Sequence, residues 1–131
     1  MVKRKGFSLI ELLVVIALIG ILTAIATASY STMQKKSRDA RRVSDMKAIQ
    51  QGMEQYYGDI YSYPGASCLP DTTYLPSGLP TDPQPAKSYT SNCSATTYCF
   101  CAEMEVETGN SDVNCDGNIT GSYFYCVHQL Q

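Results

Sequence analysis

Residues 5–28 read KGFSLIELLVVIALIGILTAIATA, and this stretch decides the architecture of the chain. From Phe7 to Ala28 it holds 22 residues with a single charge, that of Glu11. At roughly 1.5 Å per residue, a helix of that length spans about 33 Å, enough to cross the apolar core of a bilayer. We therefore predict one membrane-spanning helix at the start of the chain.

The basic residues Lys3, Arg4 and Lys5 precede the apolar run. They place the N-terminus on the cytoplasmic side and the rest of the chain outside. An ordinary secretory signal peptide is the alternative, since the small residues of Ala24–Ser29 offer a cleavage site. The apolar run is longer than the usual core of such a peptide and carries a charge, so the membrane helix is favoured.

Glu11 is an unusual residue for a membrane helix. A carboxylate inside the membrane costs on the order of 2.5–3.5 kcal/mol on insertion scales, so it needs a partner or a role. In one interpretation its side chain simply reaches the nearby membrane surface. In the other, cleavage after Gly6 frees the amine of Phe7, and Glu11 neutralises that amine on a neighbouring helix.

The string KGFSLIELLVVI (residues 5–16) resembles the leader and helix start of type IV pilins and of the pseudopilins of type II secretion. The resemblance implies that a prepilin peptidase cleaves between Gly6 and Phe7 and N-methylates Phe7. It also implies that Glu11, then the fifth residue, engages the neighbouring subunit during assembly. Many members have a proline at the position of Ala28, which this chain lacks; it retains Gly20 in mid-span.

Two further segments, YYGDIYSYP (56–64) and LPTDP (79–83), are similar to the end of the helix and the following loop in the major-pseudopilin group. Between the membrane segment and the first of them the sequence is amphipathic. Apolar residues fall mostly three, four or seven apart, at Met33, Ala40, Val43, Met46, Ile49, Met53 and Tyr56. Basic residues occupy the other faces and are expected to meet solvent or lipid headgroups: Lys35, Lys36, Arg38, Arg41, Arg42 and Lys47. We predict one helix from about residue 7 to about residue 57, ended by Gly58.

Charge and cysteine content separate the two halves of the chain. Residues 1–47 hold nine Lys and Arg and three acids, a net charge of +6, whereas residues 48–131 hold one Lys and nine acids, a net charge of −8. The acidic half disfavours nucleic-acid binding. It contains all six cysteines, and their even number downstream of an export segment predicts disulfides, of undetermined pairing, rather than a metal site: Cys68, Cys93, Cys99, Cys101, Cys115 and Cys126.

The sequence predicts an α+β, pilin-like fold, in which the long helix packs against a small antiparallel sheet. Residues 62–97 are rich in Pro, Ser, Thr and Tyr and are expected to form a long disulfide-stapled loop rather than strands. Residues 98–107 alternate as a half-buried strand with Cys99 and Cys101 on one face, so each is expected to bond a different partner. Residues 123–127 form a second strand. The predicted division is a leader (1–6), a membrane or filament-core helix (7–29), an amphipathic helix (30–58) and a disulfide-rich head (59–131).

The turn between these strands contains the only pattern that suggests a cofactor. Oxygen-bearing side chains alternate before and after Gly117, as in the first half of a calcium loop: Asp112, Asn114, Asp116 and Asn118. Tyr123 occupies the twelfth position, where the usual loop has a bidentate Glu. The alternative is a polar turn stapled by Cys115. The resemblance favours calcium, since some pseudopilins bind it in a loop of this region.

These features predict a structural protein and not an enzyme, since the single His128 has no evident nucleophile partner. The expected function is a type IV pilus-like filament subunit, stored in the inner membrane with a cytoplasmic N-terminus and assembled outside it, extracellularly or in the periplasm. Its expected partners are copies of itself, prepilin peptidase, the assembly platform and the membrane. A pseudopilin of type II secretion and a non-polymerising, membrane-anchored calcium-binding module are the alternatives. Adhesion, motility, DNA uptake and secretion all stay open.

Overall fold

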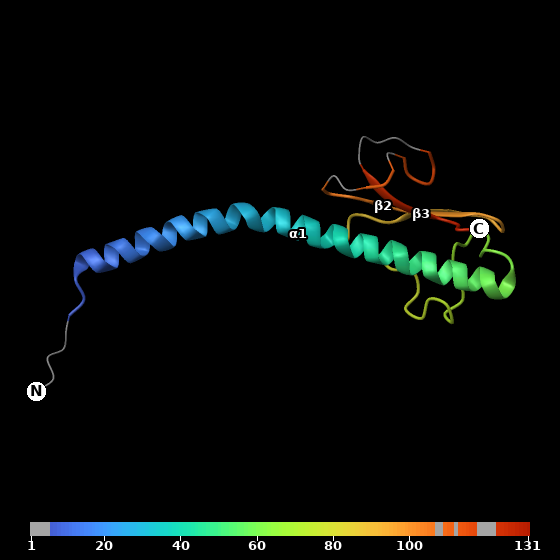
Figure 1. The fold of residues 1–131 in the computed structure, drawn as a ribbon, viewed down its shortest axis with the longest axis horizontal. Helices are drawn as coiled ribbons and strands as arrows, with labels where there is room; N and C mark the ends of the chain where they lie inside the picture. Colours follow the sequence, from blue (N-terminus) through green and yellow to red (C-terminus); the bar gives the residue numbers. More distant parts are fainter. Residues whose placement is uncertain (1–5, 107–108, 112, 118–122) are drawn as a thin grey trace, which may run out of the picture. The chain divides into compact units, whose positions relative to one another are not determined.

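The computed structural model describes residues 6–106, 109–111, 113–117 and 123–131. One long helix, α1 (Leu9–Ile60), precedes three strands: β1 (Thr90–Cys93), β2 (Tyr98–Glu103) and β3 (Phe124–His128) (Figure 1). The chain divides into two compact units, residues 1–34 and 35–131, and the second contains the latter half of α1 together with the sheet. The predicted α+β fold, a long N-terminal helix and a small antiparallel sheet, is confirmed.

The C-terminal end of α1 lies slightly beyond the expected position. Gly58 was expected to end the helix, but the helix continues to Ile60. Tyr61 then takes a φ of 56°, a left-handed conformation that commonly terminates helices. Its amide still donates to the carbonyl oxygen of Tyr57 at 2.8 Å. Tyr61 therefore supplies the left-handed cap that sequence reasoning assigned to a glycine, and Pro64 follows three residues later.

The core of the second unit forms between α1 and the sheet. Met46, Ile49 and Met53 of the helix are buried and belong to the same core cluster as Tyr98 and Phe100 of β2. The expected apolar stripe is therefore correct in its C-terminal part. Its N-terminal members are wrong as core residues: Met33 is 65% exposed and Ala40 is also exposed. Burial on the helix begins only at residue 39, because the head packs against α1 from that point onward.

The sheet is antiparallel throughout, in the order β1-β2-β3. Strand β1 was not predicted, because its sequence TSNC lacks apolar alternation; its central residues are exposed and it lies at the edge. Strand β2 ends at Glu103 rather than near residue 107. The reason is local: the amides of Glu105 and Val106 donate to the carboxylate of Asp39 on α1, so they are not available to a strand ladder.

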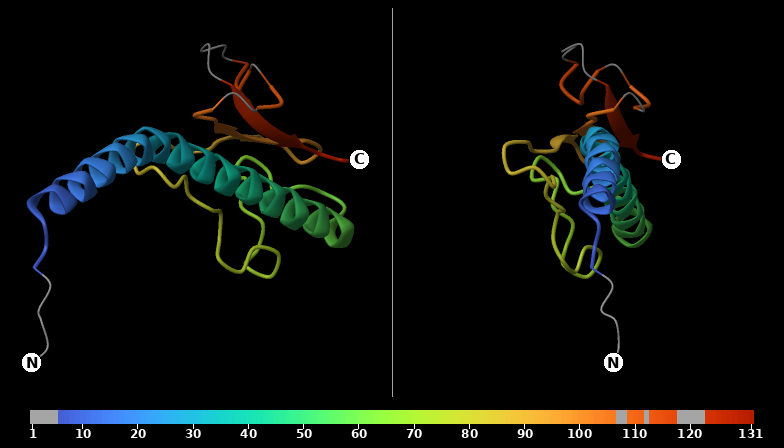
Figure 2. Two further views of the ribbon diagram at one scale, coloured as in Figure 1. Left: turned by 60° about the vertical axis from the view of Figure 1, so that its left-hand side comes forward. Right: turned by 90° about the vertical axis from the view of Figure 1, so that its left-hand side faces the viewer.

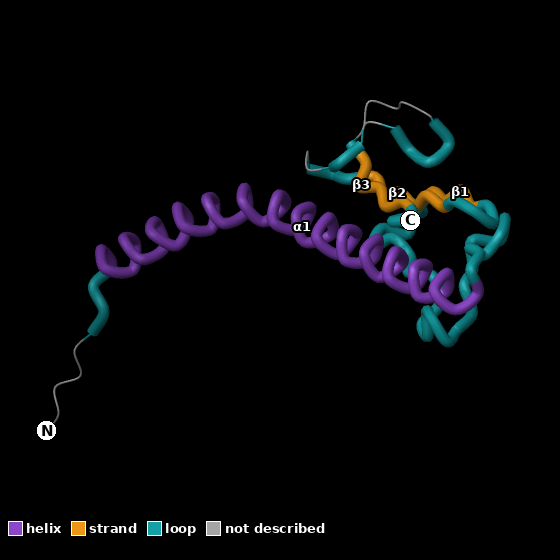
Figure 3. The backbone as a smooth tube through the Cα atoms, turned by 45° about the vertical axis from the view of Figure 1, so that its right-hand side comes forward, coloured by secondary structure: helices purple, strands orange, loops and turns teal. Residues whose placement is uncertain are grey.

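The loop between α1 and β1 passes along a different side of the same half of the helix from the sheet (Figures 1 and 2). Figure 3 shows it as a long irregular segment. It approaches the helix closely at Gly52, where an added Cβ would lie 2.9 Å from Cγ of Leu75. The disulfide Cys68–Cys93 joins this loop to β1. Packing on the helix and this crosslink hold an otherwise irregular segment in place.

Candidate assembly site

The N-terminal end of α1 carries the residues that the sequence singled out. Gly6, Phe7 and Ser8 precede the helix, and the side chain of Phe7 is 83% exposed. The amide of Ser8 donates to Oε2 of Glu11 at 3.0 Å, so the carboxylate caps the first turn of its own helix. Near a helix N-terminus a carboxylate is also favoured by the helix dipole. Glu11 is thus fixed one turn from the Gly6–Phe7 bond, on an otherwise apolar surface.

The first half of α1 is apolar on every side. Its large apolar side chains between Leu9 and Ile25 are 46–81% exposed. By length and composition the helix can cross a membrane, and none of its apolar window is buried within this chain. A surface of this kind is stable only in lipid or against other apolar helices. It is therefore the main candidate for contact with the membrane and with other copies.

The helix is continuous through Gly20, and it contains no proline that would kink it. The hydroxyl of Thr23 donates to the carbonyl oxygens of Ile19 and Gly20, at 2.9 and 3.0 Å. The hydroxyl of Thr27 does the same to Ala24 at 3.0 Å. These bonds satisfy the hydroxyls without a partner helix, which suits a segment surrounded by apolar material.

A second group of functional candidates lies at the base of the head, where α1 enters the second unit. Arg42 was expected on a solvated face, but its side chain is fully buried. Its guanidinium donates to both carboxylate oxygens of Asp82, at 2.7 and 2.8 Å, and to Asp39 and Glu105, both at 2.8 Å. Arg38 adds a bidentate pair with Glu105 at 2.7 and 2.6 Å. Its guanidinium is therefore engaged within the head, whereas it too had been expected to meet solvent or lipid headgroups. Five charged side chains thus join helix, loop and strand end, and we call them the Arg42 cluster: Arg38, Asp39, Arg42, Asp82 and Glu105.

The Arg42 cluster perturbs the ionisation of its members. Hydrogen bonds from Arg38, and then from Arg42, lower the pKa of Glu105 to about 2 against the opposing effect of burial. For Asp82 burial is the largest influence and raises the pKa, but the hydrogen bonds from Arg42 and from the Gln84 amide outweigh it, so the pKa is lowered. Asp82 and Glu105 are therefore held as carboxylates beside the guanidinium groups.

Sequence reasoning missed this cluster, although a signal was present. Asp39 and Arg42 extend the buried series Met46, Ile49 and Met53 backwards at spacings of three and four. They therefore lie on the core face of the helix. The partner Asp82 belongs to the LPTDP segment, which had been noted only for its similarity to a loop of the major-pseudopilin group.

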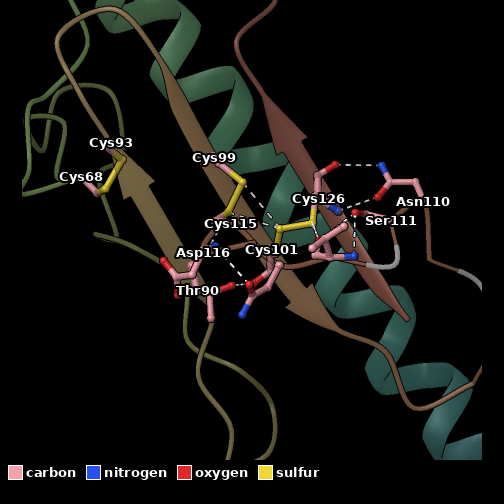
Figure 4. Close-up of a disulfide and its surroundings, with 12 residues drawn as sticks. Cys68, Thr90, Cys93, Cys99, Cys101, Asn110, Ser111, Cys115, Asp116 and Cys126 are labelled. Atoms are coloured by element: carbon pink, nitrogen blue, oxygen red, sulfur yellow. Dashed lines mark hydrogen bonds between the residues drawn. A yellow bond between two sulfur atoms is a disulfide. The ribbon is translucent and has the colours of Figure 1, made fainter. Parts of the chain in front are cut away.

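The structure joins all six cysteines in three disulfides: Cys68–Cys93, Cys99–Cys115 and Cys101–Cys126. Cys99 and Cys101 do bond different partners, as their common face predicts. The two disulfides lie side by side on that face, with Sγ of Cys115 3.3 Å from Sγ of Cys101 (Figure 4). The Cys99, Cys101 and Cys115 sulfurs lie close enough together to hold a metal, but all three are bonded in disulfides. The Cys99–Cys115 bond ties the turn after β2 to β2, and the Cys101–Cys126 bond ties β2 to β3.

The predicted calcium loop lies only partly within the described residues, because Asp112 and Asn118 fall outside them. Of the other two, Asn114 accepts a hydrogen bond from the amide of Asp116 at 3.1 Å, as in an ordinary Asx turn. Cys115 between them is bonded to Cys99. Calcium binding by these residues stays a prediction.

The N-terminal sequence matches the family described as the prokaryotic N-terminal methylation motif, over residues 1–27. Among curated proteins, the chain is 31% identical over 78 residues to the type II secretion system core protein G of Escherichia coli (strain K12), which covers 56% of this chain and 54% of that protein. It is 33% identical over 61 residues to the type IV major pilin protein PilA of Myxococcus xanthus, covering 47% of this chain and 28% of PilA. A fimbrial protein of Pseudomonas aeruginosa is 43% identical over 54 residues, covering 41% of this chain and 35% of that protein.

The chain thus spans about half the length, or less, of these curated relatives. No solved structure matches it at a significant level. None of the three names describes an enzyme, in agreement with the expectation that this chain is not one. The chain is thus similar, in its methylation motif and over up to 56% of its length, to type IV pilins and to type II secretion pseudopilins.

Proposed function

We propose that the chain is the structural subunit of an extracellular or periplasmic type IV pilus-like filament, stored in the membrane as a precursor and assembled after cleavage between Gly6 and Phe7. One observation carries the proposal: a fully apolar, unburied helix surface begins beside Glu11 and is continuous with a head stapled by three disulfides. A soluble protein would not leave such a surface uncovered. Packing these helices against one another covers it.

In this proposal Glu11 has two successive roles. In the precursor its carboxylate caps the helix by accepting from the Ser8 amide. After cleavage it neutralises the methylated amine of Phe7 on a neighbouring copy. A desolvated pair of opposite charges between two copies is worth more than the same pair in water, and this difference favours one register between neighbouring helices.

The test is to express the full chain with a prepilin peptidase and an assembly system and to measure the intact mass and the N-terminal residue. We expect a chain that starts at N-methylated Phe7 and appears in a sheared filament fraction. The variant Glu11→Val should be cleaved normally and stay in the membrane fraction. An uncut chain, or one cut near Ala28, would contradict the proposal and leave an anchored or secreted disulfide domain.

A pseudopilin of a type II secretion system is the second candidate. It is favoured because the similarity to core protein G of E. coli extends over 56% of this chain, compared with 47% and 41% for the two pilins. The location of the filament separates the two candidates. Sheared fibres on the cell surface at native expression support a pilus, whereas short periplasmic fibres and a secretion defect on deletion support a pseudopilus.

A further inference from the structure

Two surfaces lie at opposite ends of the part of α1 that belongs to the head. The first, the basal groove, has a volume of about 250 Å³ and an almost wholly apolar lining of Lys36, Asp39, Ala40, Val43, Met104 and Val106. The second, the tip, surrounds the end of the helix and is lined by Tyr56, Ile60, Leu69, Asp71, Thr73 and Tyr74. At the tip Ile60 and Leu69 are 53% and 57% exposed. An apolar groove and, in an otherwise mainly polar tip, two exposed apolar side chains thus occur on the same body.

The basal groove lies in a region with unpaired positive charge. Arg38 and Arg42 are used within the Arg42 cluster. Lys35 and Lys36 are exposed and have no ion-pair partner among the described residues, and Arg41 has only a distant one, Asp45 at 3.9 Å. Asp39 in the groove is neutralised by Arg42. Lys36, which lines the groove, is therefore a cation with no ion-pair partner among the described residues, and Lys35 precedes it on the helix.

The tip carries the opposite charge. Residues 48–86, all of them described, contain no Lys, Arg or His. Asp59 accepts from the hydroxyl of Tyr74 at 2.8 Å, and Asp71 accepts from Thr73 and Thr72. Neither acid meets a cation among the described residues. The tip is therefore negative, and no cation among the described residues of the same molecule neutralises it.

The two surfaces cannot meet within one molecule. Lys36 and Asp59 are 23 residues apart on one continuous helix, which places them about 35 Å apart at about 1.5 Å per residue. That distance is several times the Debye length of about 8 Å at physiological ionic strength. Only a second copy can bring a tip to a basal groove.

We propose that the tip of one copy docks in the basal groove of the next, with Ile60 and Leu69 against Ala40, Val43 and Met104, and with Asp59 and Asp71 facing Lys35 and Lys36. The contact joins two different patches of the same chain, so it is heterologous. Such a contact leaves one free tip and one free groove after every addition, and it therefore builds an open filament. The inference rests on the proposed function and adds to it the surfaces through which the heads stack.

A charge exchange in the full chain, expressed with its assembly system, tests the contact. We expect Lys36→Glu and Asp71→Lys each to lower the yield of sheared filaments about fivefold, because each places like charges in contact. The double variant should recover most of the yield, since the pair is restored with reversed polarity. Lys47→Glu makes the same change in net charge as Lys36→Glu, but outside the groove lining. It should leave the yield unchanged. Equal amounts of cleaved, fully disulfide-bonded subunit in the membrane are the control for folding and processing.

A photo-crosslinking amino acid in place of Leu69 gives a second readout that does not depend on yield. We expect crosslinks to residues 36–43 or to Met104 of another copy, and none of these from the same amino acid placed at the exposed Ala86. Wild-type filaments in which Leu69 crosslinks elsewhere, or in which the double variant fails to recover, overturn this interface while leaving the proposed function intact. Failure of the wild-type chain to form filaments at all contradicts the proposed function itself.

Discussion

Arg42 shows how one residue connects three segments of the head. Its side chain is fully buried, and it bonds Asp39 on its own helix, Asp82 in the loop and Glu105 after β2. Burying a guanidinium is costly, and the three carboxylates compensate only as a set. With Arg38 included the cluster holds two positive and three negative charges, so removal of Arg42 leaves several buried acids without their partner.

We therefore expect Arg42→Met to destabilise the head by about 3–5 kcal/mol, the usual cost of removing one partner of a buried ion pair. The measurement is denaturant unfolding of the full chain in micelles, followed by tyrosine fluorescence. Lys47→Met, an exposed change on the same helix, should stay within about 0.5 kcal/mol of the wild type. Equal stability of the two variants would contradict the role assigned to the cluster.

Glu105 makes the stability of the head dependent on pH. Its pKa is lowered from 4.5 to about 2 by Arg38 and Arg42, so the unfolded chain binds this proton at a higher pH than the folded chain. Its contribution is present above pH 4.5 and is lost as the pH falls toward 2. The free energy of unfolding should decline over this window. In Glu105→Gln the decline should be shallower, and the remainder includes the contributions of Asp71 and Asp82, whose pKa values are also lowered.

At the scale of elements, packing opposes helix preference at one glycine of α1, Gly52, but not at another, Gly58. A Cβ at Gly52 would lie 2.9 Å from Leu75 and 3.1 Å from the carbonyl oxygen of Tyr74, whereas at Gly58 nothing lies within 4 Å. Helix preference favours Ala over Gly by about 1 kcal/mol at either site.

We expect Gly58→Ala to stabilise the head by up to about 1 kcal/mol. Gly52→Ala should destabilise it by about 1–3 kcal/mol, because the loop must move away from the helix. The two midpoints of denaturant unfolding, compared with the wild type, provide the measurement. A shift in the same direction for both variants would show that the loop does not pack against Gly52 as described.

At the scale of the whole molecule, the sequence predicts features that repeat and misses those that depend on distant partners. The apolar run of residues 7–28 is long and unbroken, and residues 98–107 alternate; a helix forms at the first and a strand, ending at Glu103, at the second. Strand β1 has no such pattern; it forms because β2 offers an edge and Cys93 is bonded to Cys68. The burial of Arg42 depends on Asp82 and Glu105, which lie 40 and 63 residues away. The pairing of the cysteines likewise requires the fold.

The two units of the chain are stabilised by different means, and reduction should separate them. In residues 9–34 the backbone bonds are made within the helix, and an apolar environment strengthens them. The small head depends on three disulfides, each closing a loop of 16 or 25 residues and each worth about 2–4 kcal/mol. Full reduction in micelles should therefore abolish amide protection in β1, β2 and β3 while residues 9–34 stay protected. Hydrogen exchange read by mass spectrometry after peptic digestion measures both regions in one sample. Loss of protection in both regions would mean that the helix depends on the head, and protected strands after reduction would mean that the core alone suffices.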